Sequence, residues 1–72
     1  MKHYKIAYSD SRGSHEVEFG PRQKYALNYF MKIVRFPKRN VREVRLFELD
    51  LETEQETEML YHQFVATVNG RE

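Results

Sequence analysis

The chain has 72 residues, with 12 Lys or Arg against 11 Asp or Glu and a formal net charge of +1. It contains no cysteine, which excludes disulfides, thiolate zinc sites and a cysteine nucleophile. No apolar run approaches the roughly 20 residues of a membrane span. We therefore expect one small domain over residues 1–72 that is soluble and cytoplasmic and has no membrane partner.

The first segment, 3–19, has the alternation of a β-hairpin with one buried face. The stretch "DSRG" between its halves has the composition of a turn. With Arg12-Gly13 as a two-residue loop, Tyr8 would lie opposite Val17 and Ile6 opposite Phe19, which puts both apolar sets on the same face.

A helix is predicted over 21–36. Gly20 is an acceptable N-cap, Pro21 suits the first helical position, and Pro37 ends the helix. At the helical period one stripe is apolar and is expected to lie on a sheet. The stripe consists of Ala26, Leu27, Phe30, Met31, Ile33 and Val34.

A second hairpin is predicted over 41–68, with its turn centred near Glu54 and a last turn or loose tail at Asn69-Gly70. This register would pair Leu49 with Met59 and Phe47 with Tyr61, and Val44 with Phe64. Two hairpins joined by one helix predict the α+β class. The expected architecture is a two-layer ββαββ fold, a four-stranded antiparallel sheet with one helix packed on one face.

The acidic residues of the second hairpin alternate without interruption by a basic one; they are Glu48, Asp50, Glu52, Glu54, Glu56 and Glu58. The predicted register opposes Asp50 to Glu58, and like charges at that separation repel each other. Three interpretations stay open: a solvated hairpin tip that resists edge pairing, a docking tip for a basic protein, including nucleic-acid mimicry, and a divalent-cation site. The spacing lacks the glycine and closing glutamate of a calcium loop.

The basic residues gather on the helix and the segment after it, and include Arg22, Lys24, Lys32, Arg35, Lys38, Arg39, Arg42 and Arg45. Such a surface could neutralise phosphates, and Tyr25, Tyr29 and Phe36 on one flank of the helix could stack on bases. The alternative for Tyr25 and Tyr29 is that they widen the apolar stripe. A nearly neutral chain with an acidic hairpin argues against a long polyanion, and no RNP-like, KH or helix-turn-helix signature is present. Nucleic-acid binding is therefore the alternative hypothesis.

A second apolar set is predicted on the sheet face that a single helix leaves open. If Val44 and Phe64 face the helix, alternation sends Phe47, Leu49, Met59 and Tyr61 to the other face. Large apolar side chains gathered on an open face usually mark a contact surface. The expected occupant is a protein target or a second copy in a homodimer.

Catalytic and ligand-binding patterns are weak in this sequence. His3, His15 and His62 have no metal-ligand spacing, and the serines around Asp10 have no nucleophile motif. We expect no metal, no cofactor and no enzyme activity.

The leading hypothesis is a small protein-binding module, acting through its apolar sheet face and its segregated charge. In size and composition the chain is similar to small phage-encoded proteins that block host enzymes or defence complexes. An inhibitor or adaptor of phage or mobile-element type is therefore one form of this hypothesis.

Overall fold

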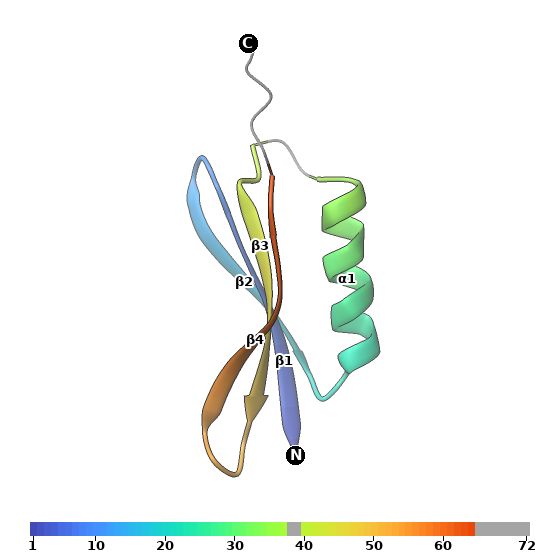
Figure 1. The fold of residues 1–72 in the computed structure, drawn as a ribbon, viewed down its shortest axis with the longest axis vertical. Helices are drawn as coiled ribbons and strands as arrows, with labels where there is room; N and C mark the ends of the chain where they lie inside the picture. The colour runs from blue at the N-terminus through green and yellow to red at the C-terminus, as the bar shows by residue number, and fades with distance from the viewer. Residues whose placement is uncertain (38–39, 65–72) are drawn as a thin grey trace.

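The computed structural model describes residues 1–37 and 40–64. The elements follow in the order β1 (Lys2–Asp10), β2 (Gly13–Gly20), α1 (Gln23–Arg35), β3 (Glu43–Asp50) and β4 (Gln55–Gln63). The strands form one open antiparallel sheet in the order β2-β1-β3-β4, and α1 lies along one face of it (Figure 1). The predicted two-layer α+β fold is confirmed. No helix in the described part of the chain is long and apolar enough to cross a bilayer.

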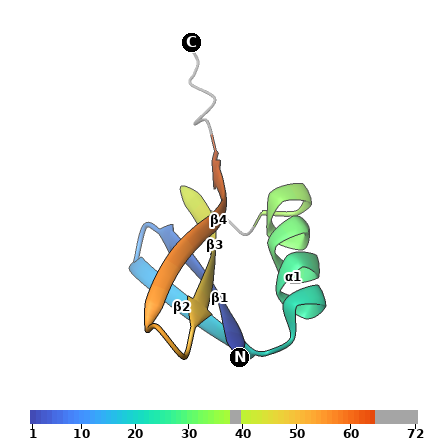
Figure 2. The same cartoon turned by 60° about the horizontal axis from the view of Figure 1, so that its bottom comes forward.

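The core lies between α1 and the central strands β1 and β3. Figure 2 shows the helix on one side of the twisted sheet, and no other described element covers the opposite side. The sheet side of the core includes Ile6, Val44 and Leu46, which are fully buried. The helix supplies Ala26, Phe30 and Ile33, with Leu27, Tyr29 and Val34 partly buried beside them.

One position of the predicted helix stripe is wrong. Met31 is 44% exposed, while Tyr29 packs against the core instead. The Tyr29 ring lies 5.3 Å from that of Phe19, in a tilted arrangement that aromatic pairs favour. Compared with the predicted stripe, the buried face of the helix is turned toward Phe19 of β2 and away from Met31.

The helix is also shorter than predicted, because Pro21 belongs to the connection that precedes it and Arg22 is the N-cap. Gly20 ends β2 with φ +59°, a left-handed conformation that favours glycine. Arg22 occupies the N-cap position without a side-chain cap, and its carbonyl accepts the hydrogen bond from the Ala26 N–H at 3.1 Å. Lys32 and Arg35 in the last turn complement the negative end of the helix dipole.

The first hairpin has the predicted faces with a different register. Asp10 pairs with Gly13, so the loop is Ser11-Arg12; Tyr8 lies opposite His15 and Ile6 opposite Val17. The shift is two residues, and a two-residue shift returns each side chain to the same face. Gly13, at φ +130°, provides the backbone conformation that closes this tight loop.

Asp10 fixes this loop and should titrate abnormally. The Arg12 backbone N–H donates to its Oδ1 at 2.8 Å, and His15 Nε2 lies 3.1 Å from the same oxygen. The Arg12 hydrogen bond foremost, then that of His15, holds the pKa of Asp10 below its ordinary 3.8. Because the folded pKa is the lower one, Asp10 stabilises the fold above about 3.8 and loses that contribution as the pH falls further.

We expect carboxyl NMR titration to give Asp10 a midpoint below 3.8. Asp10→Asn should lower the melting temperature at neutral pH and have no effect once the wild-type carboxylate is protonated. An equal loss at both pH values would contradict the assignment of this effect to the ionised carboxylate.

The second hairpin turns over four residues, 51–54, rather than at a point near Glu54. The Asp50 carbonyl accepts from the Glu54 N–H at 2.7 Å, and its carboxylate accepts from the Glu52 N–H at 2.9 Å. Glu54 adopts φ +59°, and the strands resume with Asp50 opposite Gln55. The predicted pairs of Leu49 with Met59 and of Phe47 with Tyr61 are therefore wrong: Leu49 faces Glu56, and Phe47 faces Glu58.

A β-bulge at Met59 then corrects the alternation of β4. Phe47 pairs with Glu58 and Leu46 with Leu60, so Met59 is an extra residue. Beyond it Tyr61 lies opposite Arg45 and His62 opposite Val44. Phe64 packs against the core, as predicted, but the predicted pair of Val44 with Phe64 is wrong, because Val44 faces His62. The Phe64 N–H donates to the Arg42 carbonyl at 2.9 Å. The rest of the predicted hairpin and the Asn69-Gly70 turn lie outside the described residues.

Candidate functional site

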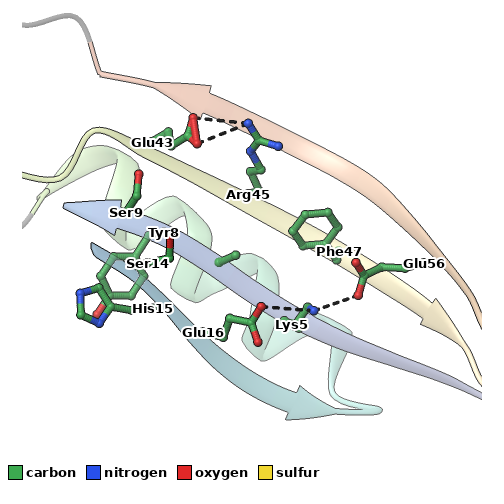
Figure 3. A pocket seen from close by; sticks show the side chains of 11 residues that line it. Lys5, Tyr8, Ser9, Ser14, His15, Glu16, Glu43, Arg45, Phe47 and Glu56 are labelled. Carbon is green, nitrogen blue, oxygen red and sulfur yellow. Dashed lines mark hydrogen bonds and ion pairs between the residues drawn. The ribbon is translucent and has the colours of Figure 1, made fainter. Parts of the chain in front are cut away.

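The candidate site is the open face of the sheet, opposite α1. Figure 3 views this face with the helix behind it. Alternation from the buried core positions brings one set of side chains here from all four strands. The set comprises His3, Lys5, Ala7, Ser9, Ser14, Glu16, Glu18, Glu43, Arg45, Phe47, Leu49, Glu56, Glu58, Tyr61 and Gln63.

Lys5 joins three strands at one end of this open face. Its Nζ lies 2.9 Å from Glu56 on β4 and 3.5 Å from Glu16 on β2 (Figure 3). The same nitrogen is 5.4 Å from the centre of the Phe47 ring, within cation–π range. The hydrogen bond to Glu56 is the main cause that raises the pKa of Lys5, while partial burial opposes it. The ammonium is therefore favoured in its charged form.

Arg45 forms a second cluster along β3 and β4. Its guanidinium contacts Glu43 and Glu58, each at 3.3 Å, and stacks over the Tyr61 ring at 4.8 Å. Burial lowers the pKa of Arg45, but Glu43 and then Glu58 raise it by more. The Tyr61 hydroxyl lies 3.4 Å from the Glu43 carboxylate and completes the cluster.

Phe47 stands between two hollows of this surface. The larger, of about 310 Å³, is lined by small residues such as Ala7, Ser9 and Ser14 and by both ion-pair clusters. The smaller, of about 120 Å³, lies between Phe47, Leu49 and His3. Phe47 and Leu49 are half-buried, which leaves part of each side chain available to a partner. This part of the open face therefore presents half-buried apolar side chains next to paired charges.

The structure brings together most of the predicted sheet patch. Phe47, Leu49 and Tyr61 lie on the open face, but Phe47 and Tyr61 are offset along the strands instead of opposite each other. Met59 occupies the bulge, so it is outside the regular alternation of β4. Its side chain is 37% exposed. The ion-pair clusters that surround Phe47 were not predicted.

The acidic residues of the second hairpin do not form one row. The turn pairs even-numbered residues of β3 with odd-numbered residues of β4 near the tip, so Asp50 and Glu56 lie on opposite faces. Glu48 lies on the helix side, where the Tyr4 hydroxyl donates to it at 3.3 Å. Glu52 and Glu54 occupy the turn and are exposed. The repulsion expected between Asp50 and Glu58 is absent from this register, since Asp50 faces Gln55.

These positions predict different effects for neutralising the acidic residues. Glu52→Gln and Glu54→Gln remove exposed charges and should change the free energy of unfolding by less than about 0.5 kcal/mol. Glu56→Gln removes the carboxylate 2.9 Å from Lys5 and should cost up to about 1 kcal/mol. Urea denaturation of the three variants at low salt measures the difference; equal effects at all three positions would contradict the Lys5 assignment.

The residues of the predicted basic surface also lie on different faces of the molecule. Arg22, Lys24, Lys32 and Arg35 are exposed along α1, and none forms an ion pair with another described residue. Arg42 is exposed just before β3. Arg45 does not belong to this surface, because it is paired on the opposite face of the molecule. Lys38 and Arg39 lie outside the described residues.

The histidines have separate packing environments. His15 stacks on Tyr8 with ring centres 5.0 Å apart, and His62 meets the Phe64 ring edge-on at 4.7 Å. Within residues 1–37 and 40–64, no three His, Asp or Glu side chains are arranged to hold a metal ion.

Comparison with protein-family models, with curated proteins and with solved structures finds no match to this chain.

Proposed function

We propose that the protein is a non-enzymatic binding module whose open sheet face docks on another protein. The observation that carries the proposal is the placement of Phe47, half-buried between two hollows on the face opposite α1. Aromatic residues and arginine are enriched at the centres of protein interfaces, and a polar rim is usual around them. Phe47, Tyr61 and Arg45 supply these groups.

The ion-pair clusters favour protein docking, because they lower the cost of removing water from this face. A charge that loses its water and has no partner strongly opposes binding. Here both cations of the face are already paired, Lys5 with Glu16 and Glu56, and Arg45 with Glu43 and Glu58. A partner can therefore cover them without leaving a buried cation unpaired.

The charge of the open face indicates the chemistry of the partner. Among residues 1–37 and 40–64, its five carboxylates exceed its two cations and give a net charge of −3. A polyanion would be repelled, and two copies placed face to face would repel each other. We therefore infer a partner other than a second copy, with basic residues around an apolar centre. A module of this kind acts by occupying a surface, as an inhibitor or adaptor does.

The test begins with affinity capture from the native cell, followed by calorimetry with the purified partner. Phe47→Ala/Tyr61→Ala should weaken that complex at least about 30-fold. Leu51→Ala, at an exposed apolar position of the hairpin turn, is the matched control and should change affinity less than about threefold. Circular dichroism establishes that each variant is folded.

Two results would overturn the proposal. An unchanged affinity in the folded double variant would show that the partner binds elsewhere. A homodimer in sedimentation of the wild type, dissolved by the same substitutions, would make a second copy the occupant.

A further inference from the structure

We propose that the outer surface of α1 binds single-stranded nucleic acid. This binding would not involve the open face of the sheet. The helix contains no acidic residue, and its exposed cations are Arg22 at the N-cap, Lys24, Lys32 and Arg35. Each is unpaired within residues 1–37 and 40–64. Unpaired cations on one surface attract a polyanion, and the counterions it releases supply affinity.

Exposed aromatic rings lie beside these cations. Tyr25 is 62% exposed and Phe36 is 75% exposed. Spacings of four, three and four residues put Tyr25, Tyr29, Lys32 and Phe36 on one flank of the helix, with a rise of about 16 Å along the axis between positions 25 and 36. A ligand that meets both rings and the cations must be extended and must repeat anionic and flat groups. A single nucleic-acid strand has this chemistry, since every base can stack on an aromatic ring.

The start of α1 offers a place for one base. A hollow of about 290 Å³ is lined by Phe19, Arg22, Tyr25 and Glu18. The Arg22 guanidinium lies 5.8 Å from the centre of the Tyr25 ring, and both groups stack on bases. Glu18 disfavours a phosphate in the hollow, so the base is the group that enters it.

The same features argue against other anionic partners. A membrane surface requires a continuous apolar face, and the apolar stripe of α1 is directed at the sheet. The remaining exposed apolar residues lie on two separate flanks, Met31 on one and Tyr25 with Phe36 on the other. A duplex keeps its bases stacked and presents no free ring face to Tyr25. An acidic protein would use the cations but has no repeated flat group for the rings.

Fluorescence anisotropy with labelled oligonucleotides of about ten residues tests the proposal. Wild-type protein should bind single-stranded RNA or DNA at low salt with a Kd of about 1–100 µM, and a duplex of the same sequence more weakly. Separate RNA and DNA strands show which of the two is preferred. Tyr25→Ala should reduce affinity about tenfold, and Tyr25→Phe, which keeps the ring, should retain it.

The salt dependence checks the charges. Lys24→Gln/Lys32→Gln should lower the slope of log K against log salt by about 1.4, since each phosphate contact contributes about 0.7. Lys2→Gln/Arg12→Gln removes the same net charge outside α1 and should leave the slope unchanged. Phe47→Ala/Tyr61→Ala should leave strand binding intact, which separates this inference from the protein-docking proposal.

Failure of the folded wild type to bind any strand would overturn the inference. An unchanged affinity in Tyr25→Ala would also overturn it. So would binding to a duplex, to anionic lipid vesicles or to an acidic peptide that is as tight as binding to the strand. Each of these results would show that the surface binds through charge alone.

Discussion

Phe30→Ala is expected to cost about 3–5 kcal/mol of unfolding free energy. Phe30 is 5% exposed and lies in the core between α1 and the central strands. Removing its ring leaves a cavity that the surrounding helix and sheet can fill only in part. A chain this short buries a small core and has little stability to lose. We therefore expect a melting temperature lowered by tens of degrees, or no cooperative transition at all.

Met31→Ala is the matched control, since it removes a large side chain from the next position of the same helix. Met31 is 44% exposed, so its loss should cost less than about 1 kcal/mol. Equal losses for the two variants in urea denaturation would show that the helix is rotated relative to the face described above.

Lys5→Glu is expected to cost about 2 kcal/mol at low salt, the next largest effect. The substitution removes the ammonium from Glu16 and Glu56 and from the Phe47 ring. It also puts a third carboxylate between two others. The Lys5 side chain is only 26% exposed, so water screens this repulsion incompletely. The loss should shrink as salt rises, because the outer carboxylates are partly exposed.

A charge exchange provides the control. Lys5→Glu/Glu56→Lys restores one opposite-charge pair between β1 and β4 and should recover part of the lost stability. Arg12→Glu, a reversal at an exposed loop position, should have little effect. The ion-pair assignment is wrong if the exchange is as unstable as Lys5→Glu alone.

The architecture could be predicted because the apolar pattern and the residues that end elements, such as Pro37, indicate the same element boundaries. Alternation in 3–19 and the helical stripe ending at Pro37 left few other folds for 72 residues. Core positions Ile6, Phe30 and Val44 follow from period alone. Met31 was misplaced because period does not fix the rotation of the helix within a broad stripe. That rotation depends on the packing of Tyr29 against Phe19, across a turn whose geometry the sequence leaves open.

The register of the second hairpin could not be read from its pattern. Six alternating acids suggest a symmetric reversal at Glu54, but Asp50 closes a four-residue turn through its own carboxylate. This displaces every later pair. The bulge then restores the faces of Leu60 and Tyr61 relative to Leu46 and Arg45. Neither feature has a glycine or proline in the sequence to mark it.

The ion-pair clusters of the open face depend on strand order, which the sequence does not give. Lys5 on β1 reaches Glu56 on β4 across β3, an intervening strand that enters the chain after the helix. A weak signal was present, since Lys5 and Arg45 are bases at alternating positions whose neighbours are buried. Recognising them as partners of Glu16, Glu56 and Glu58 would have required the sheet order β2-β1-β3-β4.

The bulge at Met59 also bears on how this chain can change in length. Glu58 and Leu60 pair with Phe47 and Leu46, which are adjacent on β3. A chain that lacked Met59 would therefore form an unbroken ladder with every side chain of β4 on its present face. A deletion at Tyr61 or His62 would instead exchange the two faces of the residues that follow it. Met59 is the position of β4 where evolution can remove a residue without rebuilding either surface of the sheet.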